Sequence, residues 1–272
     1  MRSLAAAVAA SIIAALTATA ASTVVPGGQG ASPTPDWVAR QIELRDTGKD
    51  SRGEMRMRLF DRQGRVRERA MTLLARRSPA GDRTLVRFSY PNDIKNTGFL
   101  VWEHPGADDE RFLYLPALGR VRRIAGSEKQ ESFVGSDLSY EDIGGRDIAD
   151  YTYAFADPDA TWNAADGSRH PAWALESRAK DTNADYPRTV SLVRKDNFVI
   201  VHADIYNGRN ERVKVFDVSK LDRVDGIWTV LSLAVANERD KTRTELETTS
   251  IRYNVGLSDN DFSRRELEQP TR

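Results

Sequence analysis

The sequence contains no cysteine, and this absence excludes several kinds of site at once. A disulfide framework, a thiolate zinc site and a cysteine nucleophile are all ruled out, so the fold depends on a packed core. The thiol that carries the lipid of a bacterial lipoprotein is missing as well. We therefore expect no covalent lipid anchor on this chain.

An excess charge of either sign is also missing, because 40 Lys and Arg balance 40 Asp and Glu. Nucleic-acid-binding proteins usually carry a basic excess, so we expect no nucleic-acid partner. Beyond the N-terminal segment, no stretch reaches the roughly 18 apolar residues of a membrane-spanning helix. Aromatic residues make up 8% of the chain, which is too many for a disordered protein.

The motifs of common enzymes are absent too. The three histidines, His104, His170 and His202, lie far apart, and no H-E-x-x-H pair occurs. There is no G-x-S-x-G, Walker or dinucleotide-binding motif. We therefore predict no catalytic residue, no metal, no cofactor and no enzymatic activity.

Residues 1–21 have the features of a secretory signal peptide. Arg2 precedes the alanine-rich apolar run Leu4–Leu16, and Ala18-Thr19-Ala20 has the small-x-small form of a cleavage site. An uncleaved anchor is disfavoured because the run is short. Residues 22–35, rich in Gly, Pro and Ser, are predicted to be a disordered leader before a domain at 36–272. Together with the missing lipid anchor, this predicts a periplasmic protein.

An alternating pattern dominates the chain from Gly53 onward. Met55, Met57 and Leu59 alternate with charged residues, as in a strand with one buried face. About 11 to 13 short strands separated by turn residues predict one continuous antiparallel sheet, curled or closed. A helix is expected from Asp36 to about Arg45, either packed on a core or acting as a lid over a cavity.

Two further features concern the order of the strands. Asn207-Gly208 and Asp225-Gly226 predict two-residue hairpin turns. The last strand, from Lys241 to Asn254, has no clean apolar stripe on either face. It is therefore predicted to be an edge strand or a partly wet one.

The chain resembles the outer-membrane lipoprotein-sorting protein family, in its LolA-like branch, at two phrases. These are F-L-Y-L-P-A-L-G-R-V-R-R-I at residues 112–124 and S-F-V-G-S-D-L-S-Y-E-D at residues 132–142. The similarity runs from about Trp37 to about Phe262. The resemblance implies a half-open antiparallel β-barrel, with short helices covering a concave face that holds acyl chains. Members of this branch often accompany RND-type exporters.

Under this resemblance, the chain is expected to be a periplasmic carrier or chaperone for the acyl chains of lipoproteins or lipids. It would transfer them toward the outer membrane. The alternative is a non-carrier adaptor or sensor module bound to an RND-type exporter or to lipoprotein. Burial stabilises an acyl chain by roughly 0.8 kcal/mol per CH₂, so an apolar lining suffices without a catalytic group.

Large apolar and aromatic side chains are the candidates for the cavity or its lid. They are Trp37, Leu100, Trp102, Phe112, Tyr114, Phe133 and Tyr140. Arg120 and Arg122 are candidates for contact with an anionic head group, because guanidinium groups bind phosphate well. The competing interpretation of these arginines is an exposed strand face.

Asp137, Glu141 and Asp142 form an acidic group between these features. Their spacing does not fit a calcium loop, which alternates oxygen ligands around a central glycine. A helix cap at Asp137, with the other two acids in the first turn, fits better. Contact with a partner is the other alternative.

Overall fold

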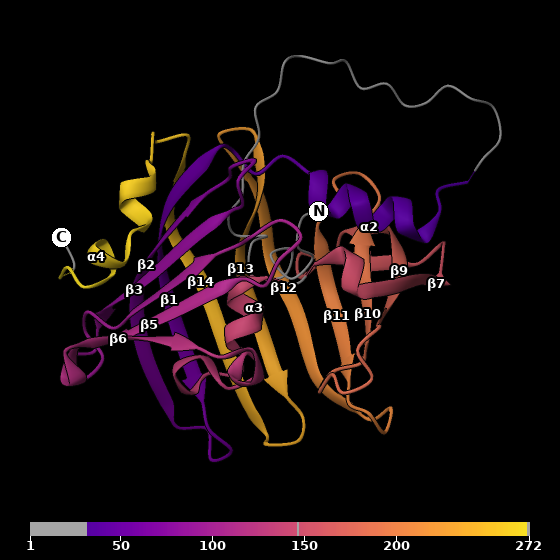
Figure 1. The fold of residues 1–272 in the computed structure, drawn as a ribbon. Coiled ribbons are helices and arrows are strands. Elements are labelled where there is room, and N and C mark those ends of the chain that lie inside the picture. The colour runs from indigo at the N-terminus through magenta and orange to yellow at the C-terminus, as the bar shows by residue number, and fades with distance from the viewer. Residues whose placement is uncertain (1–31, 146, 271–272) are drawn as a thin grey trace.

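The fold is known from a computed structural model that describes residues 32–145 and 147–270. The predicted signal peptide, and residues 22–31 of the predicted leader, lie outside this range. In the described part, all the strands belong to one bent antiparallel sheet (Figure 1). None of the helices within residues 32–145 and 147–270 is long and apolar enough to span a bilayer.

The sheet has fourteen strands, one more than the upper end of the prediction. The strands are β1 Asp50–Phe60, β2 Val66–Arg76, β3 Arg83–Tyr90, β4 Gly98–Trp102, β5 Glu110–Leu115, β6 Arg120–Ile124, β7 Tyr151–Asp157, β8 Thr161–Asn163, β9 Arg169–Ala179, β10 Arg188–Arg194, β11 Ile200–Tyr206, β12 Arg212–Val224, β13 Ile227–Asn237 and β14 Thr242–Tyr253. The additional short strand is β8, which pairs only with β9.

The order of the strands leaves the barrel open. It runs β6-β5-β4-β3-β2-β1-β14-β13-β12-β11-β10-β9-β7, so β6 and β7 are the two edges. No pairing joins these edges among the described strands. The prediction of a mainly β, half-open antiparallel barrel with few helices is confirmed.

One hairpin prediction is confirmed and the other is wrong. Asp225 and Gly226 both have positive φ, 51° and 82°, and they directly join β12 to β13. The Asn207-Gly208 connection is longer, because its hydrogen bonds close between Asn207 and Glu211. There the Asn207 side chain accepts from two backbone N–H groups, and the positive φ falls at Asn210.

The prediction for the last strand is also wrong, because β14 lies centrally between β1 and β13. Its inward side chains include Thr244 and Leu246, which are 1% and 4% exposed. Thr244 is buried although it is polar, since its hydroxyl donates to the carboxylate of Asp137. A polar inward position of this kind removes the apolar stripe that marks a central strand.

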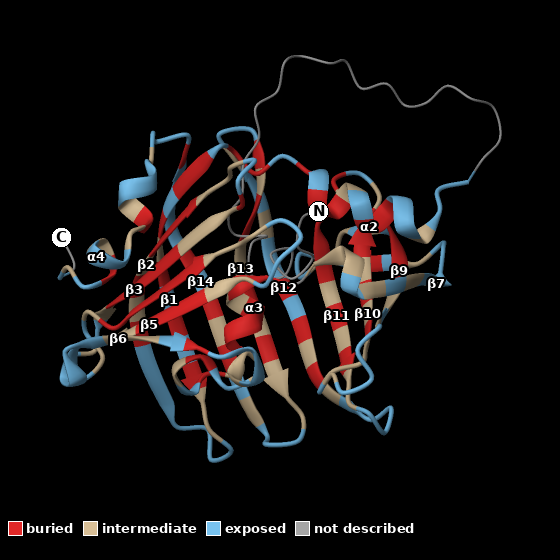
Figure 2. Cartoon of the chain, in the orientation of Figure 1, coloured by how far each residue is buried: buried red, intermediate tan, exposed pale blue. Residues whose placement is uncertain are grey.

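Each half of the alternating pattern enters a different apolar cluster. The concave cluster contains most of the core, including Met57, Phe99 and Val101. A smaller outer cluster lies on the opposite face of β2–β5, where Leu100 is fully buried. Figure 2 shows buried and more exposed positions alternating along the strands.

Short helices cover parts of both faces. Helix α2 (Pro35–Leu44) is capped by Thr34, whose hydroxyl accepts from the N–H of Trp37, and it buries Val38 and Ile42 in the concave cluster. Helix α3 (Tyr140–Gly144) lies over the middle of the concave side (Figure 1). Helix α4 (Arg264–Leu267) lies against the outer cluster, into which Leu267 inserts.

Candidate functional site

A chain segment that is mostly outside the sheet covers the concave face. We call residues 125–145, between β6 and the open side of the barrel, the covering segment. Phe133, Leu138 and Tyr140 point from it into the concave cluster and are 0%, 3% and 6% exposed. The Phe133 ring lies 5.4 Å from that of Phe99 and 5.8 Å from that of Phe88, measured between centroids. The covering segment therefore fills the centre of the concave face with aromatic side chains.

Local sequence explains the shape of this segment. Val134 and Gly135 both have positive φ, 50° and 74°, and reverse the chain after Phe133. Ser139 then caps α3, because its hydroxyl accepts from the N–H of Asp142 at 3.0 Å. The Asp142 carboxylate accepts from the N–H of Ser139 at 2.8 Å, which completes a capping box.

The prediction that Asp137 caps this helix is therefore wrong. The Asp137 carboxylate accepts instead from the hydroxyls of Thr242 and Thr244 on β14, at 2.5 Å and 2.8 Å. Glu141 forms an ion pair with Lys129 at 3.2 Å. Two members of the acidic group thus hold the segment by side-chain contacts, and only Asp142 takes part in the cap.

Arg69 provides a second attachment, which sequence reasoning missed. It lies on β2, is 8% exposed, and donates to the backbone carbonyl of Val134. Burial lowers the pKa of its guanidinium, followed by the effect of nearby Arg67. The available signal was its phase, because Arg69 alternates in step with the inward-facing Met71 and Leu73.

The seven predicted cavity residues fall on two faces of the sheet. Phe133 and Tyr140 belong to the concave cluster. Leu100 and Phe112 belong to the outer cluster, and Trp102 and Tyr114 pack against it. These four residues share one side of β4 and β5, so the structure brings them together, but away from the covering segment.

The outer group is covered by the C-terminal part of the chain. Phe262 and Leu267 are 1% and 0% exposed and complete the outer cluster. The indole N–H of Trp102 donates to the carbonyl of Phe262 at 2.8 Å. Here the aromatic hairpin serves as a docking surface for the chain's own tail.

Trp37, the seventh residue, lies at the far end of the concave side on α2. It is 37% exposed, and its ring makes edge contacts with Trp173 and Phe198, with centroids 6.4 Å and 5.6 Å away. This aromatic group adjoins β7–β11 rather than α3. Trp37 is therefore separate from Phe133 and Tyr140.

The two predicted head-group arginines differ in their contacts. Arg122 forms an ion pair with Glu128 at 2.7 Å, and this hydrogen bond raises its pKa. It is opposite Leu113 in the β5–β6 register, and Leu113 faces the concave cluster. Arg120 is exposed at the start of the edge strand. Both side chains lie near the rim of the concave face rather than inside it.

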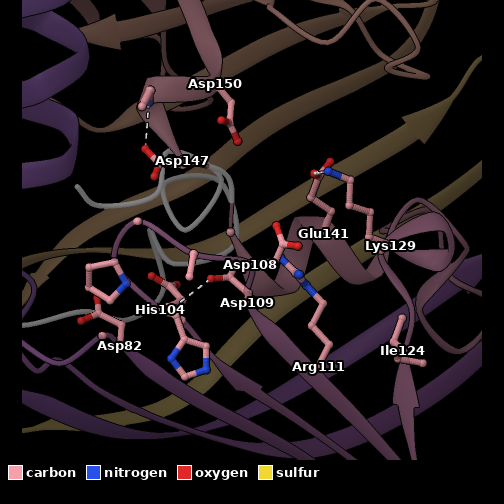
Figure 3. Close-up of a pocket in the computed structure, with 18 of the residues that line it drawn as sticks. Asp82, His104, Asp108, Asp109, Arg111, Ile124, Lys129, Glu141, Asp147 and Asp150 are labelled. Carbon is pink, nitrogen blue, oxygen red and sulfur yellow. Dashed lines mark hydrogen bonds and ion pairs between the residues drawn. The ribbon is translucent and has the colours of Figure 1, made fainter.

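A polar pocket of about 920 Å³ opens beside the covering segment (Figure 3). Its walls come from the β2–β3 and β4–β5 turns, the end of β6, and residues 145–150 before β7. Arg111 pairs there with Asp109 at 2.9 Å, and its Nε lies 2.8 Å from the position that a Cβ would take on Gly144. No group of side chains suited to holding a metal ion occurs within residues 32–145 and 147–270.

Comparison with known proteins places this architecture in a family. A family model described as "Uncharacterized protein" matches residues 80–269. A DUF1329 family protein from Desulfovibrio piger is 34% identical, with a TM-score of 0.77, 87% of this chain covered and 100% of that one. An outer membrane lipoprotein-sorting protein domain from Vibrio parahaemolyticus is 29% identical, with a TM-score of 0.79 and coverages of 87% and 98%.

The chain belongs to the LolA-like outer-membrane lipoprotein-sorting family. A LolA superfamily protein from Nitrosomonas europaea, 13% identical, shares the fold of this family member with a TM-score of 0.66 over 86% of this chain and 100% of that one. No curated protein matches the sequence. The fold is thus that of a lipoprotein-sorting or lipid-binding type of protein.

Proposed function

We propose that the protein is a periplasmic carrier that binds acyl chains of lipoproteins or lipids on the concave face of the sheet. It would receive them from an inner-membrane exporter of RND type and transfer them toward the outer membrane. The observation that carries this proposal is the apolar concave face, whose centre is covered by a separate segment and not by further strands. Membership of the LolA-like family supports the same class of function.

The covering segment occupies the surface that an acyl chain would need. Phe133, Leu138 and Tyr140 lie on the concave cluster, so binding requires their displacement. A dozen buried CH₂ groups would contribute roughly 10 kcal/mol, against the cost of moving these side chains. The polar contacts of Arg69 and Asp137 are the ones that would break when the segment moves.

Two phenylalanines on opposite faces allow a matched test of this arrangement. Phe133, 0% exposed, lies on the concave face, and Phe112, 4% exposed, lies in the outer cluster. Phe133→Ala removes part of the aromatic filling, so we expect it to bind a fluorescent fatty acid more tightly than the unaltered protein. Phe112→Ala should leave that affinity unchanged, although it costs stability to a similar extent.

Native mass spectrometry of the freshly purified protein supplies the second measurement. The carrier proposal expects co-purified lipid, released on denaturation. A lipid-free protein with no affinity for fatty acid, in the unaltered form and in Phe133→Ala, would rule the carrier function out.

The filled concave face favours one other candidate, a non-carrier adaptor or sensor module bound to an exporter or to lipoprotein. In that case the packed aromatic rings of Phe88, Phe99 and Phe133 would be a permanent core. A stable complex with the partner that survives substitution of concave-face residues would identify this function.

A further inference from the structure

The polar pocket borders the apolar concave cluster directly. Ile124, 4% exposed, lines the pocket and also belongs to the concave cluster. Glu141 lines it from α3, one residue after Tyr140, which points into that cluster. An amphiphile with its acyl chain under the covering segment would therefore bring its polar end to this pocket. The volume of about 920 Å³ falls within the range of roughly 300–1,000 Å³ for small-molecule sites.

The pocket carries more negative than positive side chains. Seven acidic residues and three basic ones line it. The basic ones are already paired, since Arg111 contacts Asp109 and Lys129 contacts Glu141, at 2.9 Å and 3.2 Å. Arg123 lies 3.5 Å from Glu110. The remaining acids thus have no basic side chain of the pocket left to neutralise them.

Glu103 and Asp150 are two such acids, on opposite walls of the pocket. Neither carboxylate forms a hydrogen bond or ion pair within the described part of the chain. Burial raises the pKa of Glu103, and neighbouring Asp82 and Asp109 add to it. Burial and Asp147 likewise raise the pKa of Asp150. Groups shifted in this direction become more stable when a cation enters.

All three described carboxyl groups whose pKa is raised, those of Glu103, Asp109 and Asp150, line this one pocket. A buried donor lies there too. Arg111 is 8% exposed, and its Nε has no hydrogen-bond acceptor. The pocket therefore combines carboxylates without a cation and a guanidinium N–H without an anion, which together match a group bearing both charges.

We propose that this pocket binds the amine-bearing head group of the amphiphile whose acyl chains the concave face receives, with Glu103 and Asp150 contacting the amine and Arg111 an adjacent phosphate oxygen. The inference rests on the proposed carrier function and adds to it the class of cargo, a phosphoethanolamine lipid in preference to an anionic one. Arg120 and Arg122, at the rim, lie outside this pocket.

The experiment compares two lysolipids that share one acyl chain, lysophosphatidylethanolamine and lysophosphatidylglycerol, by titration calorimetry below their micelle concentrations. We expect the ethanolamine lipid to bind about tenfold more tightly, the effect of one partly buried charge pair. The double variant Glu103→Gln/Asp150→Asn should lose this preference and keep its affinity for the glycerol lipid. The control Glu68→Gln/Asp185→Asn removes two exposed acids outside the pocket and should keep the preference.

The outcomes separate the two proposals. Equal binding of both lipids by the unaltered protein would overturn the head-group inference and leave the carrier function standing. Binding of neither lipid would overturn the carrier function, and the inference with it. Free phosphoethanolamine is a third ligand, and if it bound as tightly as the lysolipid, the pocket would be a site for a soluble amine and not for a lipid.

Discussion

The guanidinium of Arg69 donates a hydrogen bond to the backbone carbonyl of Val134, across the concave side of the sheet. The two residues are 65 positions apart, and the bond joins β2 to the reversal that directs Phe133 into the core. Arg69 also lies over the ring of Phe88, with its central carbon 5.8 Å from the centroid. A buried charge therefore helps to hold the covering segment against the apolar face.

Substitution of Arg69 should loosen the covering segment. Arg69→Met keeps the apolar stem and removes the charged donor, so the free energy of unfolding should fall by about 1.5–3 kcal/mol. Amide hydrogen exchange at residues 132–140 should become faster than elsewhere in the sheet. The control Arg67→Met changes an exposed arginine of the same strand. Unchanged exchange in the segment would show that Arg69 does not hold it.

Asp137 is expected to hold the same segment from the other side. Asp137→Ala leaves the hydroxyls of Thr242 and Thr244 without their acceptor, which should lower the free energy of unfolding by about 1–3 kcal/mol. Asp137→Asn keeps one acceptor oxygen and should recover part of the loss. Chemical denaturation of the three proteins measures this order. A stability of the alanine variant equal to that of the unaltered protein would contradict it.

The close approach of Gly98 to the C-terminal tail gives a prediction for the outer face. A Cβ on Gly98 would lie 2.6 Å from Leu267 Cδ1 and 3.2 Å from the Leu267 carbonyl. Gly98→Ala should therefore displace α4, cost about 1–3 kcal/mol, and make the tail sensitive to protease. Gly126→Ala is the matched control, because no atom lies within 4 Å of a Cβ there. A protected tail in Gly98→Ala would refute the prediction.

His202 gives the protein a pH-dependent contribution to stability. Its Nδ1 lies 2.6 Å from Asp217, whose hydrogen bond raises the pKa of the imidazole above its ordinary value. The folded protein then binds the proton more tightly than the unfolded chain. This stabilisation is complete below about pH 6.5, the unfolded value, and is lost as the pH rises through the raised pKa.

Denaturation of the unaltered protein and His202→Gln over a range of pH tests this sign. The difference in free energy of unfolding should be greatest at pH 6 or below and should shrink at alkaline pH. His170→Gln, at a different histidine, is the control. A difference that grows with rising pH would mean that His202 is buried neutral in the folded protein.

Much of the sheet follows from local sequence. The bounds of β3, β6 and β13 match stretches delimited by turn residues, because strand alternation and turn chemistry act over a few residues. The Asp225-Gly226 turn was predictable since few other residue pairs adopt positive φ at both positions. The candidate site was less accessible, because Glu103, Asp150 and Arg111 come from separate connections that only the closed sheet brings together.

The sequence by itself determined the alternation of each strand, the turns between most of them and the family, since these depend on neighbouring residues. Only the tertiary structure decided which face is concave. Period-two alternation separates Phe99 from Leu100 but does not say which of the two faces inward. That choice depends on the bend of the whole sheet, and on the covering segment and the tail, which occupy opposite faces after the strands have paired.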